Sequence, residues 1–66
     1  MSEQEVLKHL FSVLKTAASK EFPLNEVVRE VKKHAVLWTV WQKYKSNLVS
    51  FFMIEWKRAR SLEEAA

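Results

Sequence analysis

The absence of glycine is the feature that most restricts how this 66-residue chain can fold. Tight hairpins and left-handed turns are built mainly from glycine and asparagine, and the chain also has only one proline, Pro23. A β-rich fold with many turns is therefore difficult to make, and helices are the expected elements. Segment 36–41 is the alternative, because its β-branched and aromatic residues suit a strand. It lacks period-2 alternation, however, and no similar segment is available to pair with it.

The N-terminal segment has the pattern of an amphipathic helix. Ser2 and Glu5 have the spacing of a capping box, in which the serine side chain accepts the backbone N–H three residues on. From Val6 to Ala18, apolar residues fall on one arc at about 100° per residue, with lysine and serine on the opposite side. The sequence predicts a helix over about residues 3–20.

Beyond this helix the boundaries are less distinct. Pro23 disfavours helical geometry in the residue before it, so a turn is expected at 21–24, and Asn25 is expected to cap the next helix. We predict helices at about 24–45 and 47–62 with a bend near 45–47, or alternatively one long bent helix across both segments. The predicted fold class is all-α, a small bundle of three helices.

The length of the chain limits it to one domain, residues 1–66, standing alone or as a fragment or subunit of a larger assembly. A domain near this size buries only about 60% of the surface that its unfolded chain exposes, and its core rarely supplies more than about 3–5 kcal/mol. With no cysteine, disulfides and thiolate metal sites are excluded. Association with a second copy or with another protein is the support that remains.

The segment from His34 to Arg60 holds all three tryptophans, the only tyrosine and two of the four phenylalanines. On helices, its apolar residues cover arcs too wide for one N-terminal helix to bury. We therefore expect a homodimer or a protein partner to complete the bundle through an aromatic face. The candidate interface residues are Trp38, Trp41, Tyr44, Phe51, Phe52 and Trp56.

Positive charge is concentrated in the same region, because residues 29–60 contain eight basic and only two acidic side chains. Such a surface also suits phosphates, which makes a small nucleic-acid-binding or regulatory protein, resembling a helix-turn-helix, the alternative function. The turn of that motif would fall near His34, without the usual glycine. The candidate nucleic-acid contacts are Lys32, Lys33, Lys43, Lys45, Lys57, Arg58 and Arg60.

The sequence contains no motif of an enzyme. Paired carboxylates, a nucleophile with its base, a glycine-rich phosphate loop and metal-ligand spacing are all missing, so we expect no catalytic, cofactor or metal site. The longest nearly apolar runs are seven residues, whereas a membrane span needs about 20, and the N-terminus does not resemble a secretory signal. The expectation is a cytoplasmic helical module for protein–protein interaction, with a membrane-surface role as a minor alternative.

Overall fold

The structure, a computed structural model, describes the backbone of residues 2–65 and the side chains of residues 2–62. These residues form four helices: α1 (Glu3–Ser19), α2 (Leu24–Lys32), α3 (Ala35–Lys43) and α4 (Lys45–Ala65). The all-α prediction is confirmed, and no strand occurs in the described part of the chain, segment 36–41 included. The prediction of three helices is wrong, because the segment expected to be one helix over 24–45 is two.

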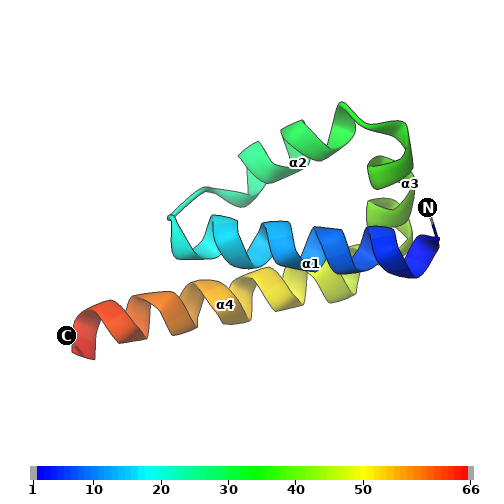
Figure 1. Cartoon of the computed structure of the whole chain (residues 1–66). Coiled ribbons are helices and arrows are strands. Elements are labelled where there is room, and N and C mark those ends of the chain that lie inside the picture. The colour runs from blue at the N-terminus through cyan, green and yellow to red at the C-terminus, as the bar shows by residue number, and fades with distance from the viewer. Residues whose placement is uncertain (1, 66) are drawn as a thin grey trace.

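Helix α1 contacts each of the other three helices, and α3 crosses near its N-terminal end (Figure 1). Helix α4 runs in the same direction as α1, and α2 runs in the opposite direction to both (Figure 1). The N-terminal end of α2 therefore lies beside the later turns of α4, and its C-terminal end lies beside the first turn of α4.

The two ends of α1 are fixed by hydrogen bonds to the backbone. At the start, the Glu5 N–H donates to the Ser2 hydroxyl at 3.2 Å, which confirms the predicted cap. At the end, the Phe22 N–H donates to the Ala17 carbonyl at 2.8 Å while Glu21 adopts a left-handed φ of 61°. This Schellman arrangement usually places glycine at the left-handed position. A non-glycine residue in this conformation costs about 1–2 kcal/mol. Because the chain has no glycine, Glu21 takes this position at that cost.

The break between α2 and α3 has a tertiary cause. An uninterrupted helix over 24–45 would be about 33 Å long, compared with about 26 Å for the 17-residue α1. Its last turns would extend beyond α1 into solvent. The extended backbone of His34 (φ −120°, ψ 111°) instead turns the chain, so that α3 packs Val40 and Trp41 against the body of the molecule.

Two further local predictions need correction. Asn25 does not cap α2, because the cap position is taken by Pro23 and Asn25 lies within the helix. The predicted bend near 45–47 lies earlier, at Tyr44, and Lys45 already begins α4. The turn before α2 is made at the proline itself, whereas Tyr44 carries no strong turn preference.

The core lies along α1, and each of the other three helices contributes buried residues to it. It contains Val6, Leu10, Leu14, Ala17, Ala18, Val27, Val31, Val40, Trp41, Leu48 and Phe52. Among the side chains of residues 2–62, none that is buried is polar or charged. In the part of the chain that the structure describes, no helix has the length and apolar character needed to cross a membrane.

Candidate functional site

An apolar groove runs between α2 and α4, made of two adjoining hollows that share Leu24. The hollow at the C-terminal end of α2 has a volume of about 460 Å³ and is lined by Leu24, Val28, Lys32, Trp38, Trp41, Gln42, Lys45 and Val49. The hollow at the N-terminal end of α2 has a volume of about 410 Å³ and is lined by Pro23, Leu24, Phe52, Met53, Trp56 and Lys57. We call the two together the lysine-rimmed groove. No acidic residue lines it among the side chains that the structure describes.

The candidate basic residues divide into two groups. Four of them pair with carboxylates: Lys33 with Glu30, Lys43 with Glu3, Arg58 with Glu55 and Arg60 with Glu21. The other three, Lys32, Lys45 and Lys57, form no ion pair with any described carboxylate. All three line the lysine-rimmed groove.

Arg60 has a structural role in joining α4 to the end of α1. Its guanidinium donates to the Ala18 carbonyl at 3.2 Å, lies 3.7 Å from the Glu21 carboxylate and stacks 4.7 Å from the centre of the Trp56 ring. The arginine side chain is only 22% exposed. A guanidinium used in this way supports the fold and has little surface left for phosphate.

The six candidate interface aromatics also occupy different positions. Trp41 and Phe52, 2% and 5% exposed, belong to the chain's own core and form the floor of the groove. Phe51 packs edge-on against Phe11 of α1, with ring centres 4.9 Å apart. Of the six candidate aromatic residues, only Trp38 and Trp56 are half-buried and line the groove.

Tyr44, the sixth candidate aromatic residue, does not line the groove and belongs to a polar cluster at the α3–α4 junction. The Lys43 ammonium lies 2.9 Å from the Glu3 carboxylate, and it also lies 5.7 Å from the centre of the Tyr44 ring. Hydrogen bonding from Lys43, and then from the Tyr44 hydroxyl, lowers the pKa of Glu3, while the same carboxylate raises the pKa of Lys43 and of Tyr44. The cluster ties the start of α1 to the α3–α4 junction.

Replacing Glu3 with glutamine is expected to lower the melting temperature at pH 7 and to have less effect in acid. A carboxyl group whose pKa is lower in the folded than in the unfolded chain stabilises the fold above its unfolded value, here 4.5. That contribution is lost as the pH falls through the folded pKa. Melting curves of the two proteins between pH 7 and pH 3 should therefore converge below about pH 4.5. A difference that stays constant over this range would contradict the assignment.

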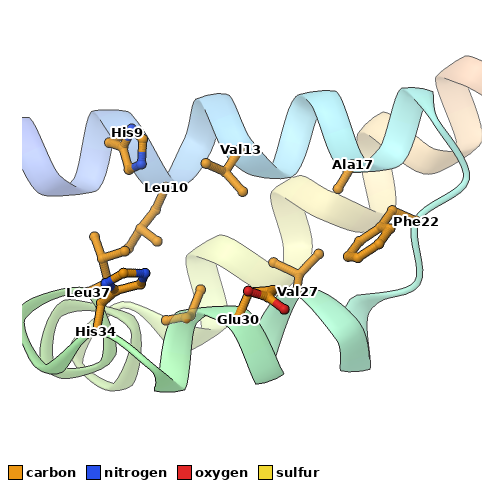
Figure 2. A pocket seen from close by; sticks show the side chains of 10 residues that line it. His9, Leu10, Val13, Ala17, Phe22, Val27, Glu30, His34 and Leu37 are labelled. Carbon is orange, nitrogen blue, oxygen red and sulfur yellow. The ribbon is translucent and has the colours of Figure 1, made fainter.

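A smaller hollow of about 220 Å³ lies on the other side of α2, facing α1 (Figure 2). Leu10, Val13 and Ala17 of α1 face Val27 of α2 across it, with Phe22 at one end and His34 near Leu37 at the other (Figure 2). Its volume is below the range of about 300–1,000 Å³ typical of ligand sites. Among the described residues, no group of three histidine or acidic side chains is placed to hold a metal ion.

The lysine-rimmed groove combines apolar walls, two tryptophans and lysines whose charge is not neutralised. Such a surface can bury apolar side chains and attract negative charge at its edge. The sequence carried a signal for it, since Lys45, Val49, Met53 and Lys57 recur every four residues on α4, as do Leu24, Val28 and Lys32 on α2. The groove exists only because α2 and α4 lie side by side, and the spacing of residues along each helix does not predict that arrangement.

No protein family, curated protein or solved structure matches this chain at a significant level. The function therefore has to be argued from the groove itself.

Proposed function

We propose that this chain is a protein–protein interaction module that binds a segment of a partner protein in the lysine-rimmed groove. The observation that carries the proposal is the position of Lys32, Lys45 and Lys57. These are the three candidate basic residues without a carboxylate partner among the described side chains, and all of them border one apolar groove. Half-buried tryptophans in an apolar patch with a charged rim are typical of protein interfaces.

Nucleic-acid binding receives less support from the same geometry. As a recognition helix, α3 would expose Ala35, Val36, Thr39, Gln42 and Lys43, and among its polar side chains only Gln42 is not engaged by another described residue of the chain. The Thr39 hydroxyl donates to the Ala35 carbonyl at 2.9 Å, and Lys43 is engaged by Glu3. Both of the groove tryptophans also have a cation over the ring, which a stacking base would have to displace.

Two neighbouring residues on α4 allow a matched test of the proposal. Met53 lines the groove and is 54% exposed, whereas Ile54 is 57% exposed and does not line it. With a photo-reactive benzophenone amino acid at position 53, irradiation of cells expressing the chain is expected to give adducts with a partner protein. The same amino acid at position 54 should give few.

Equal adducts at positions 53 and 54, or none at 53, would contradict docking in the groove. An adduct at 53 that is removed by nuclease and not by protease would favour the nucleic-acid alternative instead.

A further inference from the structure

We infer that the occupant of the lysine-rimmed groove is an acidic amphipathic α-helix of another protein. Its apolar stripe lies between α2 and α4, and its carboxylates face Lys32, Lys45 and Lys57. This inference rests on the proposed function and adds to it the conformation and the charge of the partner segment.

The length and shape of the groove suit a helix. Its α4 wall extends from Lys45 to Lys57, and a rise of 1.5 Å per residue makes this about 18 Å, or slightly more than three turns of a helix. The walls come from α2 and α4, which run in opposite directions (Figure 1). The buried rings of Trp41 and Phe52 form the floor. An amphipathic helix lying along such a floor presents apolar anchors at every third or fourth residue, which is a recurrent mode of peptide recognition.

The distribution of charge indicates an acidic occupant. The acidic side chains of α2, Glu26 and Glu30, pair with Arg29 and Lys33, and Glu30 lines the hollow that faces α1 instead. On α4, Glu55 pairs with Arg58 and does not line the groove. The groove is therefore bordered by lysine charges with no neighbouring carboxylate among the described residues, and carboxylates of a partner would complement them.

The same charges argue against a second copy of the chain in this groove. The chain has a formal net charge of +3, and two copies meeting through this surface would bring lysine rims together. Like charges placed opposite each other at an interface are unfavourable. A flat anionic membrane fits poorly too, because the apolar side chains line a hollow between two helices and do not project from a single convex face.

A synthetic peptide provides the test. It has blocked ends and about 14 residues, with leucine at every third or fourth position and glutamate or alanine elsewhere. An isomer with the same composition but no apolar stripe is the control peptide. Binding to the full chain is measured by fluorescence anisotropy, and the striped peptide is expected to bind at least about tenfold more tightly than its isomer.

Two variants of the chain separate the groove from general charge. One carries Lys32→Gln, Lys45→Gln and Lys57→Gln, and the other carries Lys8→Gln, Lys15→Gln and Lys20→Gln on exposed positions of α1. Both lower the formal net charge from +3 to zero. Exposed ion pairs contribute up to about fivefold each, so the groove variant should lose about tenfold or more in affinity. The α1 variant should stay within about twofold, and circular dichroism checks that both remain folded.

Several outcomes would overturn the inference. Equal loss in the two variants, or equal binding of the two peptides, would mean that only net charge matters. Tighter binding of a DNA oligonucleotide or of anionic vesicles, reduced in the groove variant, would assign the surface to those partners. If cross-links form at position 53 but the striped peptide does not bind, the proposed function stands and the acidic helix is wrong. If neither cross-links at position 53 nor peptide binding is observed, the proposed function and the acidic helix are both wrong.

Discussion

Trp41→Ala is expected to leave most of the chain unfolded at 25 °C. The Trp41 side chain is the largest of the fully buried side chains, and it joins α3 to the core beneath the groove. Removing a buried tryptophan costs about 3–5 kcal/mol. A single core in a chain of this length supplies about the same amount, so little stability remains. Far-ultraviolet circular dichroism and urea titration would measure the loss.

Trp38→Ala is the matched comparison for this experiment, because Trp38 lies one turn earlier on the same helix and is only half-buried. That variant should keep its helicity and show a cooperative melt. If Trp41→Ala retains wild-type helicity and the wild-type melting temperature, the placement of α3 against α1 is wrong.

The second large effect concerns binding, and it also falls on Trp38. The Trp38 ring lines the groove with the Lys32 ammonium 5.2 Å from its centre, so its loss removes both an apolar anchor and a support for one of the rim lysines. Tryptophans at the centre of an interface typically contribute 2 kcal/mol or more, or about 30-fold in affinity. Trp38→Ala should therefore weaken binding of the striped acidic peptide by about 30-fold, measured by anisotropy.

Val36→Ala gives the control on the same helix, since Val36 is 61% exposed and does not line the groove. It should bind the peptide with nearly unchanged affinity. If Trp38→Ala and Val36→Ala lose similar amounts of peptide affinity, the peptide contacts another part of α3 or the substitutions change the fold.

The parts of the fold that follow from local chemistry were predictable from the sequence. Helices were expected because the chain has no glycine, and the start of α1 at Ser2 and the turn around Pro23 followed from capping and proline geometry. The break at Lys33 and His34 did not follow from such local signals, although the helix-turn-helix alternative placed a turn near His34. Neither residue is a helix breaker, and the turn follows from the fit of four helices to one another.

The break between α2 and α3 also explains why the sequence suggested more aromatic surface than one chain can bury. A single helix over 24–45 leaves the later aromatic residues without cover. Two shorter helices instead enclose Trp41 and Phe52 within the chain. Dimerisation is thus no longer required to bury these two rings.

The candidate site was only partly predictable for a similar reason. The basic and aromatic residues of the segment are evident from the sequence, and the pairs of Lys33 and Arg58 with carboxylates three residues earlier follow from helical spacing. The pairing of Lys43 and Arg60 does not, because their partners lie far away in the sequence. Lys43 meets Glu3, which is 40 residues away in the sequence, and Arg60 meets Ala18, which is 42 residues away. Spacing along one helix does not predict such contacts.

Intermolecular nuclear Overhauser effects between the isotope-labelled chain and the striped acidic peptide test the central claim most directly. The peptide leucines should show contacts to the methyl groups of Leu24, Val28, Val49 and Met53, which line the groove. They should show none to Val36 and Ile54, which are exposed outside it. Contacts to Val36 or Ile54 without contacts to Val28 and Val49 would contradict the account.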